Sequence, residues 1–150
     1  MTKTHDNLEA FTRGYAHAML WANTQSVSDT DTVDTDPTDV DPMAWHTGDP
    51  DWALDAFDAD SQVSIHEDCE AFFASSLRDL ISYSRTYSPV GGFDVWECAG
   101  HDFALTRNSH GAGFWDRGMG ELGDRLSDMA RPFGESTAWT TDSDEYAHLF

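Results

Sequence analysis

The expected architecture rests on one stretch, residues 100–126, which reads GHDFALTRNSHGAGFWDRGMGELGDRL. Apolar and polar residues alternate over 101–107, and alternation of this kind favours a β-strand. A turn-forming sequence occupies 108–111, and 112–116 then offers a second short strand. We therefore expect a β-hairpin here, followed by a helix over about 119–132.

The chain before this hairpin shows helical periodicity. Apolar residues recur every three or four positions over 7–23 and again from about 61 or 64 to 83, which predicts two main helices. Asp49-Pro50 is typical of a helix start and introduces a shorter third helix near 52–57.

The chain after the hairpin offers two more short strands, at 137–140 and 146–150, on either side of a polar turn. Together the elements predict an α+β fold. Two main helices and a shorter third would pack on a small antiparallel β-sheet, in a single domain over residues 1–150.

Charge is the outlying property of the composition. The 150 residues include 28 acidic and only 8 basic ones, for a formal net charge of −20. A field of this sign repels nucleic-acid backbones and acidic lipid surfaces. Three interpretations stay open: a solvated surface suited to solubility or high salt, a surface that attracts a basic protein by imitating a phosphate backbone, and carboxylates that bind divalent cations.

The sequence gives no sign of export or membrane insertion. No apolar run approaches the roughly 20 residues of a membrane-spanning helix, and the N-terminal residues lack the apolar stretch of a signal peptide. Cys69 and Cys98 have no paired spacing, so neither a disulfide framework nor a cysteine zinc site is indicated. We expect a cytoplasmic protein.

Residues 24–51 alternate aspartate with small polar residues, which favours a long, exposed acidic loop. The Asp-x-Asp spacing lacks the glycine and glutamate that an EF-hand calcium loop requires. The candidate partner-binding acids lie in this loop and on the helices after it: Asp29, Asp31, Asp34, Asp36, Asp39, Asp41, Asp60, Glu67, Asp68 and Glu70. Those on the 61–83 helix also have a structural explanation, because carboxylates near a helix start complement the helix dipole.

Residues 100–126 also resemble a known family. The matching runs are HDF at 101–103, LTRN at 105–108, HG at 110–111, GFWDRG at 113–118 and GD at 123–124. They are similar to small uncharacterised proteins of bacteriophages and other mobile elements, which share an N-terminal helix, an acidic middle and an acidic helix with a central cysteine, like Cys69. The resemblance implies a phage or mobile-element origin, and hence the cytoplasm of an infected host. It brings no activity with it.

Four residues of the expected hairpin could converge as ligands of a divalent metal. They are His101, Asp102, His110 and Asp116. Opposed strands can bring such side chains within reach of one ion, which would make the protein a small metal-dependent enzyme. An HNH nuclease is disfavoured, because the helix after the hairpin has no histidine to act as a ligand.

The same stretch has a structural interpretation. Arg107 can pair with Asp116 across the hairpin or with an acidic helix, and Trp115 can pack the hairpin onto the helices. Asn108 and the two neighbouring histidines are explained less well by a turn. This leaves the motif as a scaffold with three residues whose role is open.

The charge therefore gives the stronger indication of function. We expect a non-enzymatic accessory protein that binds a basic or DNA-binding host protein through its acidic surface, in the sharpest form a DNA-mimic inhibitor of a host DNA-binding or defence protein. No direct nucleic-acid binding, no membrane contact and no cofactor are expected, while a bound divalent metal and a homo-oligomer stay open.

Overall fold

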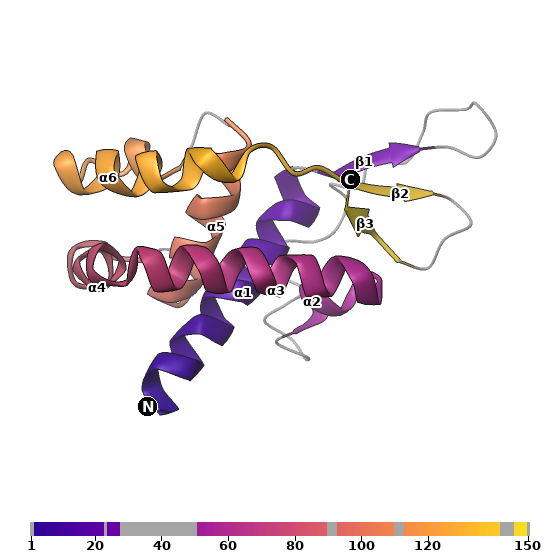
Figure 1. The fold of residues 1–150 in the computed structure, drawn as a ribbon, viewed down its shortest axis with the longest axis horizontal. Coiled ribbons are helices and arrows are strands. Elements are labelled where there is room, and N and C mark those ends of the chain that lie inside the picture. The colour runs from indigo at the N-terminus through magenta and orange to yellow at the C-terminus, as the bar shows by residue number, and fades with distance from the viewer. Residues whose placement is uncertain are drawn as a thin grey trace.

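The polypeptide is mostly helical in the part of the chain that the structure, a computed structural model, describes (Figure 1). The described residues are 2–22, 24–27, 51–89, 93–109, 113–141 and 146–149. The α-helices are α1 (Thr2–Ala22), α2 (Trp52–Asp55), α3 (Ala59–Ser75), α4 (Leu77–Thr86), α5 (Val95–Arg107) and α6 (Glu121–Ala130). The remaining elements are two 3-10 helices, η3 (Phe114–Asp116) and η4 (Arg131–Phe133), and three strands, β1 (Thr24–Val27), β2 (Ala138–Thr141) and β3 (His148–Leu149).

The crossing of α1 and α5 is the most extensive helix contact among the described elements. Gly14 of α1 lies against the backbone of Glu97, and Gly100 of α5 lies against the backbone of Phe11. A Cβ atom at either glycine would overlap those backbone atoms. The two glycines therefore let the helices approach more closely than any larger residue would permit.

Phenylalanine rings fill the core beside this crossing. Phe72 of α3 and Phe103 of α5 stack with ring centroids 4.2 Å apart and planes 10° apart. Phe11 of α1 lies 5.9 Å from each of these rings, and Phe114 of η3 lies 5.8 Å from Phe72. All four side chains are fully buried, so the burial of these large apolar surfaces is the main force that holds α1, α3, α5 and η3 together.

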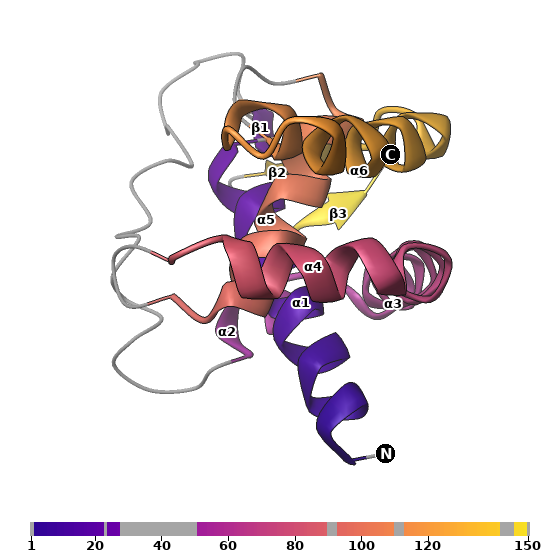
Figure 2. The same cartoon turned by 90° about the vertical axis from the view of Figure 1, so that its left-hand side faces the viewer.

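The single long helix expected over about 61–83 is wrong, because Ser76 divides it into α3 and α4. Asp58 caps α3 by accepting a hydrogen bond from the Ser61 amide at 3.0 Å, and Ser76 has φ −114° and ψ 14°, outside the helical range. Figures 1 and 2 show the result: α3 lies in the plane of one view and α4 in the plane of the other. The chain thus turns sharply at Ser76.

The hairpin expected over 101–116 is also wrong. Residues 101–107 belong to α5, and the place of the second strand holds η3. Nearly every residue of this part of α5 is buried, including Asp102, Thr106 and Arg107. The alternation of polar and apolar residues suggested a strand with one exposed face. In the structure the polar side chains are buried as well, because each has a partner inside the protein.

The sheet is small and has the strand order β1-β2-β3. The last hairpin is confirmed: β2 and β3 are antiparallel, with Trp139 opposite His148. β1 pairs in parallel with β2 and lies in the segment expected to be loop, whose residues 28–50 fall outside the described part of the chain. The predicted α+β class is therefore wrong, since helices dominate the described residues and the strands form only a small appendage.

The other helix predictions are confirmed with shifted bounds. The helix expected over 7–23 is α1, the short third helix is α2, and the helix expected over 119–132 is α6 continued by η4. Within the described residues, none of the helices combines the length and the apolar character needed to cross a membrane.

Candidate functional site

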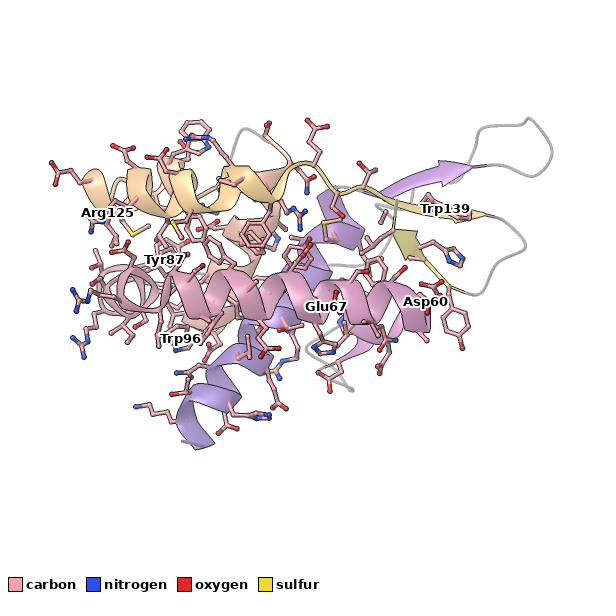
Figure 3. The ribbon with its side chains drawn as sticks, in the orientation of Figure 1. Asp60, Glu67, Tyr87, Trp96, Arg125 and Trp139 are labelled. Carbon is pink, nitrogen blue, oxygen red and sulfur yellow. The ribbon has the colours of Figure 1, made fainter. Side chains whose placement is uncertain are left out.

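A groove of about 520 Å³ separates the first half of α3 from the segment that leads from η4 into the sheet. We call it the acidic groove. Its lining residues are Asp58, Asp60, Ser61, Ser64, Glu67, Asp68, Arg107, Glu135, Ser136, Trp139, His148 and Leu149. Figure 3 shows Asp60 and Glu67 on α3 and Trp139 on β2, the elements on its two sides.

Arg107, at the end of α5, is fixed by four hydrogen bonds. Its guanidinium donates to the Asp68 carboxylate at 2.7 Å, to the Tyr15 hydroxyl at 3.0 Å, and to the backbone oxygens of Gly134 at 2.8 Å and Phe133 at 2.9 Å. The side chain is mostly buried, and its hydrogen bonds join α1, α3, α5 and η4, although it also forms part of the groove wall. The structural interpretation of Arg107, pairing with an acidic helix, is confirmed.

Three other carboxylates of the acidic groove have no cationic partner among the described residues. Asp60, Glu67 and Glu135 are exposed and make no ion pair with any described residue. Asp68 and Asp58, by contrast, are engaged with Arg107 and His148. The groove therefore presents net negative charge to solvent.

β3 forms part of the groove wall and is bonded to the start of α3. His148 Nδ1 lies 2.8 Å from Asp58 Oδ2, and the His148 ring stacks on Trp139 with centroids 4.5 Å apart. The Leu149 amide donates to Ser61 Oγ at 3.0 Å. The hydrogen bond from the Ser61 side chain, followed by that from His148, lowers the pKa of Asp58 below its ordinary value against the opposing effect of burial. Asp58 thus acts both as helix cap and as anchor for β3.

A second groove, of about 470 Å³, lies beside the first half of α3 and shares Asp58 with the acidic groove. We call it the apolar groove. Its lining residues are Phe57, Asp58, Ala59, Gln62, Val63, His66 and Tyr146. Val63 and Tyr146 are large apolar side chains that are 55% and 44% exposed, whereas Phe57, which lines the same groove, is fully buried. The first half of α3 is therefore a ridge between an acidic groove and an apolar one.

The candidate partner-binding acids divide into three groups. Asp60, Glu67 and Asp68 all line the acidic groove, and Glu70 lies on α3 as an exposed side chain outside it. The loop acids lie outside the described residues: Asp29, Asp31, Asp34, Asp36, Asp39 and Asp41. The helix-dipole explanation fails for Glu67 and Glu70, because α3 begins at Ala59 and these residues lie two or more turns beyond its start.

The candidate metal ligands are not gathered by the described structure. Asp102 is fully buried, bonded to Arg117 and to the Tyr83 hydroxyl, while Asp116 is exposed on η3. His110 lies outside the described residues. The group close enough to share an ion within the described ranges is a different one, the exposed His5, Asp6 and Glu9 of α1. A metal site that includes His110 stays a prediction.

The rest of the motif supports the packing of α5. Asn108 caps this helix: its side-chain amide donates to the Ala104 oxygen at 2.9 Å, and its oxygen accepts from the Ser136 amide at 2.7 Å. Thr106 Oγ1 accepts from the Phe114 amide at 3.2 Å, which ties η3 to α5. Trp115 is 48% exposed and does not fill the core. Asn108 therefore has a structural role that the turn interpretation missed.

A smaller cavity of about 170 Å³ is lined by Tyr87, Phe93, Cys98, His101 and Arg117. Burial lowers the pKa of His101 to about 3, with the nearby His17 and Arg117 acting in the same direction. Burial likewise raises the pKa of the Cys98 thiol to about 11. Neither group changes protonation near neutral pH, so the pair is poorly suited to general acid–base or thiolate chemistry there.

Comparison with protein-family models, with curated proteins and with solved structures finds no match to this chain. What can be inferred about function therefore comes from the charge and shape of the described surface.

Proposed function

We propose that this protein is a non-enzymatic accessory protein, of phage or mobile-element type, that binds a basic macromolecular partner through its acidic surface. The observation that carries the proposal is the exposed row of carboxylates on α3, formed by Asp60, Glu67 and Glu70. We call these three residues the α3 acid row. None of them is neutralised by a cation in the described part of the chain, and two of them open into the acidic groove.

The distribution of the basic residues supports this proposal. The described structure pairs five of the eight basic side chains with acids of the chain itself, and these are Arg13, Arg107, Arg117, Arg125 and Arg131. Few cations are left to offset the remaining acids, so the field around the protein stays negative. Such a field attracts basic partners and accelerates their association, most strongly at low ionic strength.

In its finer form the proposal is DNA mimicry directed at a host DNA-binding or defence protein. The α3 acid row runs along one side of the helix from Asp60 to Glu70, about 15 Å at the rise of an α-helix. A row of negative charges at this scale can occupy a cationic surface that otherwise binds phosphates. Inhibition would follow from competition, with no chemical step.

Capture from a bacterial lysate tests the proposal. The immobilised protein should retain DNA-binding proteins at low salt, release them at high salt, and lose them to added duplex DNA. The variant Asp60→Asn/Glu67→Gln/Glu70→Gln should retain less. The matched control removes three exposed acids elsewhere, Asp116→Asn/Glu121→Gln/Asp124→Asn, and should behave as the wild type does. The proposal would be refuted if the captured proteins were retained equally at low and high salt, or if no basic proteins were captured.

A further inference from the structure

We propose that the first half of α3 docks a basic segment of the partner that carries one large apolar side chain between its cations. The apolar side chain would enter the apolar groove, between Val63 and Tyr146. The flanking lysines or arginines would lie against Asp60 and Glu67, at the edge of the acidic groove. The inference rests on the proposed function and specifies which chemistry of the partner is recognised.

The apolar groove is the first observation behind this inference. Single exposed apolar residues are common on protein surfaces and need no explanation. Here, however, two of them, Val63 and Tyr146, line the same groove, together with a fully buried phenylalanine, Phe57. The volume of about 470 Å³ lies within the range of roughly 300 to 1,000 Å³ that is typical of ligand pockets. It is therefore large enough for one leucine, phenylalanine or tryptophan side chain.

The order of side chains along the ridge is the second observation. Asp60, Val63 and Glu67 stand at positions i, i+3 and i+7 of α3, so they follow one another along one face of the helix. All three are exposed. An acid, an apolar residue and a second acid therefore succeed one another over about 10 Å. A complementary segment would present a cation, an apolar side chain and a second cation.

Charge disfavours the other common occupants of an apolar groove. A second copy of this chain would bring another net charge of −20 to the same surface, and nucleic acids and acidic lipid surfaces would be repelled likewise. A neutral apolar peptide could fill the groove but would gain nothing from the charges of Asp60 and Glu67. A basic protein segment satisfies both the groove and its acidic border.

Two synthetic peptides test the inference. Both are arginine-rich and fluorescently labelled, and they differ only in a central residue, tryptophan in one and serine in the other. We expect the tryptophan peptide to bind the wild-type protein about tenfold more tightly, because it buries a large apolar surface. The variant Val63→Ser/Tyr146→Ser should reduce this ratio to about one while still binding both peptides in a salt-dependent way.

The chain offers a matched control. Trp115 and Met129 are 48% and 38% exposed but do not line the apolar groove. The variant Trp115→Ser/Met129→Ser should therefore keep the tenfold preference. All four replaced side chains are at least partly exposed, and circular dichroism melting curves of each variant verify that the fold is retained.

The outcomes separate this inference from the proposed function. Salt-dependent binding without a preference for tryptophan, or a preference that survives Val63→Ser/Tyr146→Ser, would overturn the inference and leave the proposed function standing. No binding of either peptide at low salt would overturn both.

Discussion

Asp102 of α5 lies fully buried against Arg117, with its Oδ1 2.6 Å from Arg117 Nη2 and its Oδ2 2.8 Å from the Tyr83 hydroxyl. Burial raises the pKa of Asp102, and the Arg117 guanidinium opposes that rise. The ion pair joins α5 to the segment after η3, and Tyr83 extends it to α4. A carboxylate that resembled a metal ligand in the sequence is thus the centre of a structural cluster.

Removal of the Arg117 cation should therefore strongly lower the free energy of unfolding. Arg117→Met leaves the Asp102 charge buried without its counter-ion, and such breaks cost about 3–5 kcal/mol. Asp102→Asn should cost less, because the Arg117 side chain is partly exposed and can reach water. Urea unfolding monitored by circular dichroism measures both. If Arg117→Met lost less than about 1 kcal/mol, the buried pair would not be a major element of stability.

The close crossing of α1 and α5 predicts that replacing Gly100 by alanine lowers stability, although the same change stabilises an isolated helix. In an isolated helix, replacing glycine by alanine stabilises by about 1 kcal/mol. At Gly100 a Cβ would overlap the backbone of Phe11, so Gly100→Ala should instead destabilise by about 1–3 kcal/mol or more. Thermal and urea unfolding decide between the two signs. A stabilised variant would mean that α1 and α5 do not cross as closely as described.

Asp58 should contribute more to stability than its neighbour Asp60. Asp58→Ala removes the cap of α3 and the partner of His148, which should cost about 1 kcal/mol or more. Asp60→Ala is the control, because Asp60 is exposed and makes no ion pair within the described chain. Equal losses in the two variants would argue against the cap.

Asp58 also predicts a pH dependence. Its pKa is lowered in the folded state, so its stabilising contribution is present above its ordinary pKa and is lost as the pH falls through the lower folded value. Urea unfolding at several acidic pH values should show this loss in the wild type and in Asp60→Ala, but not in Asp58→Ala. A loss of the same size in all three proteins would contradict the assignment.

His101 predicts acid sensitivity at higher pH. Its ordinary pKa is near 6.5, and in the folded protein the pKa is about 3, so below about pH 6.5 the unfolded chain binds the proton first. Stability should fall by about 1.4 kcal/mol per pH unit through this window because of His101. His101→Asn should remove that slope, whereas His66→Asn, at an exposed position, should not. Identical slopes in both variants would contradict the buried, neutral state of His101.

The sequence predicted well those elements that have one apolar face. α1 and α6 follow from their periodicity, and the β2–β3 hairpin follows from a local turn between two short strands. α5 could not be recognised in this way, because the partners of its polar residues come from distant segments: Tyr83 and Arg117 for Asp102, and Asp68 for Arg107. Once such partners exist, a helix can be buried on all sides and its periodicity disappears.

The candidate site was predictable in part for the same reason. Asp60 and Glu67 were expected to bind a partner from charge alone, and both line the acidic groove. Glu135 and Trp139 lie in the same groove because the fold brings the sheet against α3, where the Leu149 amide of β3 bonds to Ser61. The sheet itself depends on β1, which pairs with β2 from more than 100 residues away. Val63 did carry a local signal, as an apolar residue between acids on an exposed face. The apolar groove could not be predicted from Val63 alone, because its other exposed apolar residue, Tyr146, is distant in the sequence.

The central claim is that the α3 acid row binds a basic partner, and the salt dependence of affinity tests it most directly. The arginine-rich peptide with serine at its centre is titrated at increasing salt against the wild type, against Asp60→Asn/Glu67→Gln/Glu70→Gln, and against the control Asp116→Asn/Glu121→Gln/Asp124→Asn. Both variants change the net charge by the same amount. We expect the wild type and the control to show the same steep loss of affinity with salt, and the α3 variant to bind about tenfold more weakly at low salt with a shallower dependence. Equal affinities of the two variants at every salt concentration would contradict the claim.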